Sequence, residues 1–241
     1  MSRPSIRRAL KRSGAVVPPR PPRAGPRNLG IAPPPKVFLP GEGPDAGPVD
    51  FSAIFGRKAP VEMEIGVGKG RFLLNAAAAS PDRDFFGLEI EAEYAAIVRV
   101  RAERAGLTNV RVERLDGKAF VHARLAPGSL AALHVYFPDP WPKKRHHKRR
   151  LVEPEWAAAA ARALAPGALL RVASDHAEYW AVIDAVLSAE PLLAKLSEKE
   201  AGEWSTGTNY ELKFLKSGRS IRKAVFRRVT SPASAPSPAA A

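Results

Sequence analysis

The feature that most constrains the fold is a repeated alternation of short apolar runs with longer helical ones. The first units are an expected strand over 61–65, a helix over 71–79, a strand over 84–90 and a helix over 92–105. Short apolar runs bounded by turn residues predict buried strands, and the longer runs predict helices. Strands that alternate with helices form parallel sheets with helices on both faces. The sequence therefore predicts an α/β fold.

The same alternation continues through the middle of the chain and changes near its end. Further strands are expected over 109–115, 131–137 and 168–173, and further helices over 118–125, 154–164 and 179–187. The late segments Tyr210–Leu215 and Ala224–Val229 are expected to close the sheet as an antiparallel pair. A chain of 241 residues with 45% hydrophobic content can bury one sizeable core, so we expect one domain over residues 42–229.

Both ends of the chain have a composition that does not suit a packed core. Residues 1–41 contain nine Lys and Arg, ten of the 24 prolines and no Asp or Glu. This composition favours a disordered basic arm that either attracts RNA or only keeps the protein in solution. The Ser, Pro and Ala of residues 230–241 predict a disordered tail.

Charge and composition also limit the class of protein. The formal net charge of +14 predicts a polyanionic partner. Outside the arm, 29 basic residues face 24 acidic ones, and six of the basic residues lie in the run 143–150, so this run outweighs the remaining surplus. The absence of cysteine excludes disulfides, thiolate zinc sites and a cysteine nucleophile. No apolar run is long enough to span a membrane, so we expect a cytoplasmic protein, monomeric or homodimeric.

A glycine-rich turn follows the first expected strand and carries the first sign of a ligand site. Gly66, Gly68 and Gly70 have the spacing Gly-X-Gly-X-Gly, directly after Glu64. Glycines at this turn let the backbone approach a ligand at the carboxyl edge of the sheet. A dinucleotide site requires the longer spacing Gly-X-Gly-X-X-Gly. The acidic residue before the turn favours a positively charged ligand, although a turn that serves only packing is the alternative.

Two further acids end the next two expected strands. Glu89 lies about 20 residues after the glycine turn, where a carboxylate can accept hydrogen bonds from the hydroxyls of an adenosine ribose. Asp116 ends the third strand and can accept from the adenine amino group. Each acid alone could be an ordinary surface or capping carboxylate. Three acids at successive strand ends beside a glycine turn predict a cofactor site.

The segment after the fourth expected strand combines aromatic, acidic and basic residues. It reads Tyr-Phe-Pro-Asp-Pro-Trp-Pro over 136–142, followed by eight Lys, Arg and His over 143–150. Flanking prolines stiffen the loop around Asp139, and aromatic rings can stack on a nucleobase. Lys and Arg supply phosphate contacts. The segment predicts a loop that delivers a base to the cofactor, because a solvated basic loop leaves Asp139 and Trp141 unexplained.

These motifs together resemble the bacterial tRNA (guanine-N7)-methyltransferases. The resemblance runs from about Val61 to Val229 and includes Ser-Asp-His at 174–176 and Thr-Asn-Tyr-Glu at 208–211. It implies a Rossmann-like class I fold with a mostly parallel seven-stranded sheet, S-adenosyl-L-methionine as cofactor, and methylation of the variable-loop guanine at position 46 of tRNA. Two departures are Pro142, where a polar residue is common, and the proline-rich arm, which has no counterpart.

The resemblance also implies roles for individual residues. Asp139 is implied as the catalytic residue. Cofactor contacts are implied for Glu64, Gly66, Gly68, Gly70, Glu89, Asp116 and Asp139. Substrate contacts are implied for Lys143, Asp175, Thr208, Asn209, Tyr210 and Glu211. RNA contacts are implied for Arg145, His146, His147, Lys148, Arg149 and Arg150.

For some of these residues, structural roles are the alternative. Asp175 could cap the helix that follows it, and Tyr210 and Glu211 could only close the sheet. We expect no metal site, because His146 and His147 have no nearby set of carboxylates and no cysteine.

The expected chemistry needs alignment more than a base. Guanine N7 carries an in-plane lone pair and no proton, so no general base is required to create the nucleophile. We therefore expect Asp139 to hold the guanine through its hydrogen-bond donors and to stabilise the positive charge that develops on the ring.

Three alternative functions have distinguishing features. A nicotinamide dehydrogenase would need the longer glycine spacing, and it leaves the basic loop unexplained. A non-catalytic RNA-binding protein leaves the strand-end acids unexplained. A methyltransferase acting on an amino group of a base is the nearest competitor, and identifying the modified nucleoside separates it from the N7 enzyme.

Overall fold

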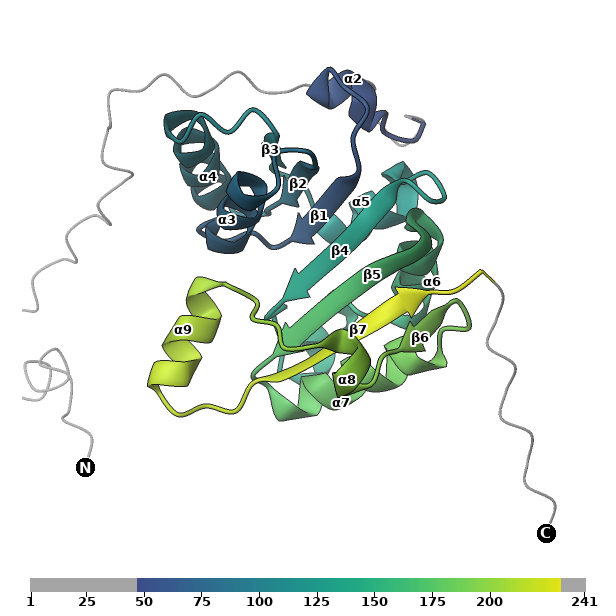
Figure 1. The fold of residues 1–241 in the computed structure, drawn as a ribbon. Helices are drawn as coiled ribbons and strands as arrows, with labels where there is room; N and C mark the ends of the chain where they lie inside the picture. The colour runs from purple at the N-terminus through teal and green to yellow at the C-terminus, as the bar shows by residue number, and fades with distance from the viewer. Residues whose placement is uncertain (1–46, 231–241) are drawn as a thin grey trace, which may run out of the picture. The chain divides into compact units, whose positions relative to one another are not determined.

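The computed structural model describes residues 47–230, which form a seven-stranded sheet with helices on both faces (Figure 1). The strand order is β3-β2-β1-β4-β5-β7-β6. Strands β1 to β5 run parallel, and β7 is antiparallel to both β5 and β6. The predicted parallel α/β sheet is confirmed. The arm expected over 1–41 and residues 231–241 of the expected tail lie outside the described residues.

The secondary-structure elements follow the predicted alternation along the chain. The strands are β1 (Val61–Ile65), β2 (Asp84–Leu88), β3 (Val110–Glu113), β4 (Leu130–Tyr136), β5 (Leu164–Ser174), β6 (Leu193–Lys195) and β7 (Arg222–Arg228). The helices are α2 (Phe51–Phe55), α3 (Arg71–Ala79), α4 (Ala92–Arg104), α5 (Gly117–Arg124), α6 (Pro154–Ala163), α7 (Ala177–Ala189), α8 (Glu198–Ala201), α9 (Asn209–Lys216) and the 3-10 helix η1 (Lys144–Arg149). None of the helices within residues 47–230 is both long enough and apolar enough to cross a membrane.

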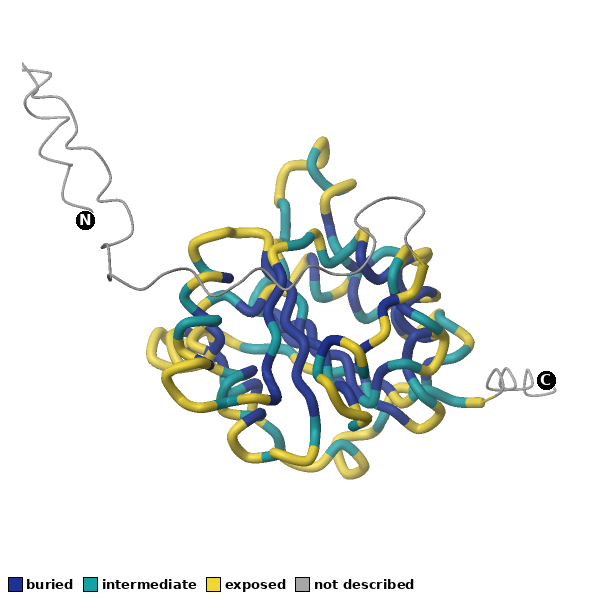
Figure 2. The backbone as a smooth tube through the Cα atoms, turned by 90° about the horizontal axis from the view of Figure 1, so that it is seen from above, coloured by how far each residue is buried: buried dark blue, intermediate teal, exposed yellow. Residues whose placement is uncertain are grey.

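Two apolar clusters hold the helices to the two faces of the sheet. Helices α3 and α4 pack on one face, and α5, α6 and α7 cover the other (Figure 1). The larger cluster includes Trp156 and a run of buried alanines in α6, whose small side chains allow the helix to lie close to the sheet. The smaller cluster joins Leu73 and Val98 to β2 and β3. The central strands are the most deeply buried part of the chain (Figure 2).

The predicted strand Tyr210–Leu215 is wrong, because this segment forms helix α9. The Thr208 hydroxyl accepts a hydrogen bond from the backbone N–H of Glu211 and so caps the helix. Glu211 and Phe214, three residues apart, are the buried side chains of one helix face. The predicted strand Ala224–Val229 is confirmed as β7. Its edge partner is β6, a strand of three residues that is too short to show in the sequence pattern.

Gly87 in the middle of β2 has no room for a side chain. A Cβ atom there would lie 2.7 Å from Val67 and 2.8 Å from Leu73, and both side chains belong to the smaller apolar cluster. We expect Gly87→Ala to lower the free energy of unfolding by about 1–3 kcal/mol through overpacking. Denaturant titration would measure this loss. Gly47→Ala is the control, because a Cβ at Gly47 meets nothing within 4 Å; equal stability of the two variants would contradict the tight packing at Gly87.

Candidate functional site

A pocket of about 340 Å³ lies at the carboxyl edge of the sheet. It is lined by the turn after β1, the start of α3, the end of β4 and the start of α9. In the strand order, β2 lies on one side of β1 and β4 on the other, so the direction of winding reverses here. Open α/β sheets bind ligands at such a switch point, and the volume is within the range of small-molecule sites.

The three glycines of the turn adopt backbone conformations that suit glycine. Gly66, Gly68 and Gly70 have φ values of 80°, 52° and 73°, in the left-handed region. The backbone N–H of Gly66 donates to the carbonyl of Leu88 at 2.8 Å. A Cβ at Gly70 would also lie 2.6 Å from Val98 of α4. The turn is therefore held against the end of β2 and against α4, and its glycine content has a structural cause.

Glu64 places a buried carboxyl group in the pocket. The residue is 2% exposed, and its Oε2 has no hydrogen-bond partner among residues 47–230. Burial, followed by the negative charge of Glu89, raises the pKa of Glu64 to about 8. A positively charged ligand in the pocket would supply the missing partner and favour the ionised carboxylate.

Glu89 and Asp116 lie beside the same turn at the ends of β2 and β3. One carboxylate oxygen of Glu89 accepts from the Gly68 N–H at 2.8 Å, and the other accepts from the Glu91 N–H at 3.0 Å. Asp116 is exposed, and its Oδ1 caps α5. A Cβ at Gly117 would lie 2.4 Å from Ile65, so the chain after Asp116 passes close to the end of β1. The structure brings all three predicted acids to the region of the pocket.

Asp139 lies in a loop whose backbone is strained on both sides. Phe137 and Trp141 have φ values of 55° and 43°, which are unusual for residues other than glycine. The Phe137 ring packs against Phe214 of α9, with 5.3 Å between ring centroids. The Asp139 carboxylate is exposed between these two turns. The loop is thereby fastened to α9 and presents Asp139 to solvent.

The Tyr210 ring packs against the Asp139 loop, with 5.9 Å between its centroid and that of the Phe137 ring. Burial raises the pKa of Tyr210, and the electrostatic effects of Tyr94, Asp139 and Glu89 raise it further. Tyr210 itself lines the pocket and is 49% exposed.

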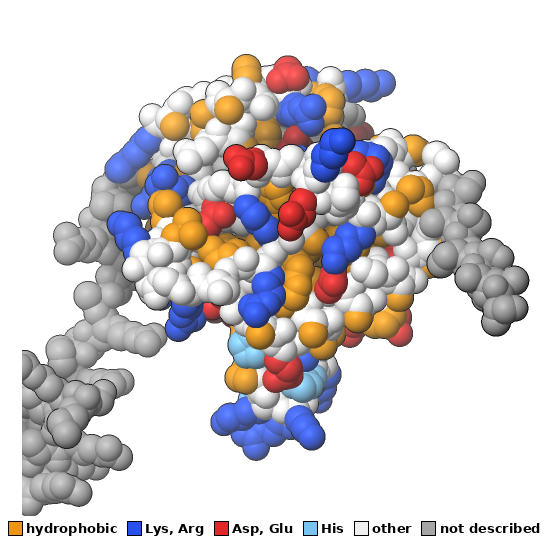
Figure 3. Space-filling model, turned by 60° about the horizontal axis from the view of Figure 1, so that its bottom comes forward, with side chains coloured by type: hydrophobic (Ala, Val, Ile, Leu, Met, Phe, Trp, Pro, Cys, Tyr) orange, Lys and Arg blue, Asp and Glu red, His pale blue; other side chains and the backbone are white. Residues whose placement is uncertain are grey.

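The lysines and arginines of residues 143–150, here called the basic segment, are exposed with one exception. Lys143, Lys144, Arg145, Lys148 and Arg149 are all exposed. The Arg149 guanidinium lies 4.9 Å from the centroid of the Trp141 ring, which stiffens the segment. Figure 3 shows Lys, Arg and His side chains gathered on a protruding part of the surface. These residue types match the composition of the basic segment.

Arg150 is the exception, since it is only 6% exposed. Its guanidinium donates to the Pro140 carbonyl at 2.9 Å and to Glu178 Oε1 at 3.0 Å, and it lies over the Tyr179 ring. Arg150 therefore anchors the loop to α7. Its role as an RNA contact remains a prediction without support from its position.

The two histidines of this segment, which are predicted to contact RNA, lie beside side chains of the same loop and of α7. His146 packs edge-on against Trp141, and His147 lies 3.9 Å from Glu178. No group of three His, Asp or Glu within residues 47–230 is arranged to hold a metal ion.

The loop before α9 is organised around Glu211. This residue is 6% exposed, and its Oε2 accepts from the Thr206 hydroxyl and from the Gly207 N–H, each at 3.0 Å, as well as from the Ser205 hydroxyl. Its carboxylate thus satisfies its own loop. Thr208, Asn209 and Tyr210 line the pocket, as the prediction of substrate contacts requires.

Asp175 lies at the end of β5, and it does not cap the next helix. His176 is the N-cap of α7, and its side chain accepts from the Tyr179 N–H at 3.3 Å. The alternative of a capping Asp175 is therefore wrong. Asp175 Oδ2 instead accepts from Arg219 at 2.9 Å. This ion pair ties the segment between α9 and β7 to the end of β5.

A buried polar chain next to the pocket was not predicted from the sequence. Glu62 accepts a hydrogen bond from Arg83 at 2.7 Å and forms another with His134 Nε2 at 2.9 Å. His134 Nδ1 in turn forms a hydrogen bond with the Tyr136 hydroxyl at 2.8 Å. Burial lowers the pKa of His134, although Glu62 opposes this effect. A neutral His134 that donates to Glu62 accepts the Tyr136 proton. The Tyr136 oxygen at the pocket wall then has its lone pairs free to accept a hydrogen bond.

The spacing of residues in the sequence already indicates part of this hydrogen-bond network. Glu62 and Glu64 are two residues apart and therefore lie on the same face of β1, and in the parallel register Glu64 lies opposite His134. Since side chains two residues apart share a face, His134 and Tyr136 lie on that same face. The register between strands, which the sequence pattern does not supply, brings these polar side chains within hydrogen-bonding distance of one another.

The chain is similar to known methyltransferases in sequence. A family model described as "Putative methyltransferase" matches residues 58–224. A protein of Bordetella pertussis named tRNA (guanine-N(7)-)-methyltransferase is 39% identical over 183 residues, covering 75% of this chain and 72% of that protein. A protein of the same name from Cutibacterium acnes is 43% identical over 186 residues, covering 75% and 67%.

Solved structures agree at the level of the fold. The crystal structure of the 16S rRNA methyltransferase KamB superimposes with a TM-score of 0.50 at 17% sequence identity, covering 76% of this chain and 93% of that one. At this identity the likeness shows the fold alone.

The raised pKa of Glu64 predicts a pH dependence of stability in the protein without ligand. In the folded state Glu64 keeps its proton up to about pH 8, whereas in the unfolded state it loses the proton near its ordinary pKa of 4.5. The free energy of unfolding therefore falls as the pH rises between these two values. We expect Glu64→Gln to reduce this fall, by an amount on the order of a few kcal/mol. Denaturant titrations at pH 5.5 and 8 measure the difference, and an unchanged fall in the variant would contradict the buried, protonated state.

Proposed function

Because the chain belongs to the tRNA (guanine-N(7)-)-methyltransferase family, we propose that it methylates the guanine at position 46 of the tRNA variable loop, with Asp139 as its catalytic residue. The general activity, transfer of a methyl group from S-adenosyl-L-methionine to N7 of a tRNA guanine, follows from the family. The observation that carries the proposal is the position of the Asp139 loop, in which Asp139 is exposed and the Phe137 ring packs 5.9 Å from the ring of Tyr210, a residue that lines the pocket. We further propose that the enzyme acts in the cytoplasm.

The pocket residues fit S-adenosyl-L-methionine. The unpartnered Oε2 of Glu64 is buried in a pocket that also carries the charge of Glu89, and a cationic ligand would relieve both. When bound, S-adenosyl-L-methionine supplies an electrophilic methyl group on a positively charged sulfur. Without a positively charged ligand, Glu64 keeps its proton and its buried Oε2 stays without a partner.

The turn after β1 and the acids beside it would hold the two ends of that molecule. Both oxygens of Glu89 are already oriented by backbone N–H groups, and each retains lone pairs that can accept from ribose hydroxyls. The glycines allow close approach of the backbone, so we include Gly66, Gly68 and Gly70 in this site. Asp116 uses Oδ1 to cap α5, which leaves Oδ2 available for the adenine amino group.

The guanine would enter from the side of the Asp139 loop. The strained turns at Phe137 and Trp141 fix the backbone on both sides of Asp139, so its carboxylate does not have to be ordered when the base binds. A fixed negative charge beside the purine favours the transition state, in which positive charge accumulates on the ring. Asn209 and Tyr210 line the pocket beside this loop and would contact the same base.

The exposed cations of the basic segment would hold the RNA backbone near the site. We assign phosphate contacts to Arg145, Lys148 and Arg149, with Lys143 nearer to the base and His146 and His147 at the flank. Arg150 and Glu211 support the site by fixing its two loops. Asp175 would act with its partner Arg219 at the end of β5.

The first test identifies the methylated nucleotide. The protein is incubated with labelled S-adenosyl-L-methionine and an unmodified tRNA transcript, and the labelled nucleoside is identified by mass and mapped by nuclease digestion. We expect 7-methylguanosine at position 46. A transcript with adenine at position 46 is the control and should take up no label. Label retained in that transcript, or found in another nucleoside, would contradict the proposed target.

The second test addresses Asp139. We expect Asp139→Asn to lower kcat by about 100-fold, because a neutral amide does not stabilise the developing positive charge. The Kd for tRNA should change little, since the exposed cations remain. Asp82→Asn is the matched control, because Asp82 is an exposed aspartate in the turn before β2. Wild-type kcat in the Asp139 variant would remove this residue from the mechanism.

A further inference from the structure

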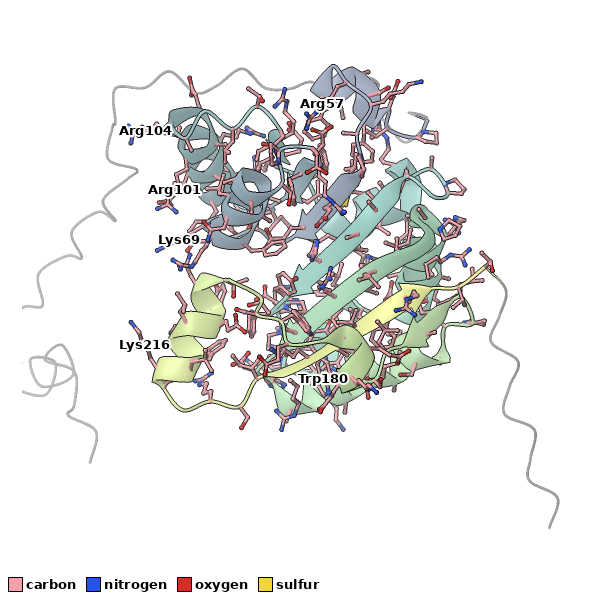
Figure 4. All side chains as sticks on the ribbon, viewed as in Figure 1. Arg57, Lys69, Arg101, Arg104, Trp180 and Lys216 are labelled. Atoms are coloured by element: carbon pink, nitrogen blue, oxygen red, sulfur yellow. The ribbon has the colours of Figure 1, made fainter. Side chains whose placement is uncertain are left out.

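A second group of exposed cations lies on the other side of the pocket from the basic segment. These residues come from the glycine turn, the start of α3, the last turn of α4 and α9, and all are exposed. We call this group the α4–α9 basic strip, which consists of Lys69, Arg71, Arg101, Arg104, Lys213 and Lys216. Figure 4 labels four of them, which follow one another along one side of the molecule from α4 past the glycine turn to α9.

The strip follows the rim of the pocket. Arg101 and Arg104 are three residues apart on α4 and therefore share a face. The Arg101 guanidinium donates to the carbonyl of Lys69 at 2.8 Å, which ties α4 to the glycine turn. Lys213 of α9 lines the pocket together with Lys69. Lys216 follows one helical turn later on α9.

The cations of the strip lack acidic partners. Among residues 47–230, none of the six forms an ion pair, although several other arginines of the domain do, such as Arg57 with Asp84 and Arg99 with Glu113. The exposed acid Glu103, beside Arg104 on α4, pairs with none of them either. Six like charges at neighbouring positions repel one another unless an anion lies over them.

The strip and the basic segment lie on opposite faces of the sheet. The basic segment rests on α5 and α7, since Lys118 of α5 donates to the carbonyl of Lys148, and Arg150 pairs with Glu178 of α7. The strip instead lies with α3 and α4, which cover the other face, and the loop before α9 joins them there, since Tyr136 contacts both Phe72 of α3 and Trp204 of that loop. The two basic surfaces therefore approach the carboxyl edge of the sheet, where the pocket opens, from two sides.

We propose that the α4–α9 basic strip binds the phosphodiester backbone of tRNA, so that the substrate is held on both sides of the pocket. This inference rests on the proposed function. Phosphate contacts fix the register and orientation of a nucleic acid, and contacts on one side alone leave it free to pivot. Transfer to a single ring nitrogen requires close alignment, which a two-sided grip supplies. Because the two surfaces flank a pocket, they suit a folded RNA that inserts a base between them.

The net charge of the sequence does not reveal the strip. Outside the arm, the run 143–150 alone exceeds the net surplus of positive charge, so it alone is expected to bind RNA. Net charge cancels cations against acids wherever they lie, and many acids of this chain are in the pocket or in ion pairs. The tertiary structure separates the two signs in space and leaves a second basic surface.

The test reverses two charges of the strip that do not line the pocket. Arg104→Glu with Lys216→Glu should raise the KM for tRNA by about tenfold near physiological salt. The slope of log Kd against log salt concentration should fall by about 1.5. The KM for S-adenosyl-L-methionine, and kcat at saturating tRNA, should remain unchanged. The double variant Lys58→Glu with Arg162→Glu is the matched control, because it makes the same change of charge before β1 and at the end of α6.

The outcomes separate this inference from the proposed function. If both double variants have the same KM for tRNA and the same salt slope, the strip does not contact tRNA and the inference is overturned. If wild-type protein binds tRNA but forms no 7-methylguanosine, the function fails whatever the strip does. Thermal unfolding checks the fold of each variant. If the two charge reversals in the strip together prevent folding, Arg104→Ala and Lys216→Ala carry the same test singly, each with about half the change in slope.

Discussion

Hydrogen bonds between the glycine turn and the end of β2 are the constraint on which the site depends. Gly66 donates to the Leu88 carbonyl, and Gly68 donates to the Glu89 carboxylate. These bonds close the turn over the carboxyl edge of the sheet, so that Glu64 and Glu89 lie beside the same turn. Glycines adopt the required left-handed conformations, and Gly70 also leaves space for Val98. The proposed cofactor-binding turn and the start of the helix that follows it are therefore formed by the same few residues.

The domain places the buried acids Glu64 and Glu89 at or beside the pocket and exposed cations around it. Burial makes ionisation of Glu64 costly in the absence of a cationic ligand, so the pocket selects for positive charge. The exposed cations of the basic segment and of the strip remain in solvent, where ionisation costs little and an anion can reach them. A small cation and a large polyanion can thus bind side by side without competing for the same groups.

Local patterns predicted most elements but failed where tertiary contacts decide. The strand β1 and the helix α3 have the predicted bounds, because apolar runs and the glycine turn mark them clearly. The segment 210–215 has apolar side chains that also suit a strand, yet the cap at Thr208 and the burial of Glu211 make it a helix. Among the candidate site residues, Arg150 is basic like its neighbours, and only its packing on Tyr179 and Glu178 shows that it anchors the loop.

The sequence by itself determined the α/β class, the position of the glycine turn, the acids at the strand ends and the family. These features depend on residue type and on spacing along the chain, which folding does not alter. Only the tertiary structure decided which polar groups meet across strands, as Glu62, His134 and Tyr136 do, and which cations stay unpaired. Both depend on strand register and on the faces that helices turn outward, and these are set by packing between segments far apart in the sequence.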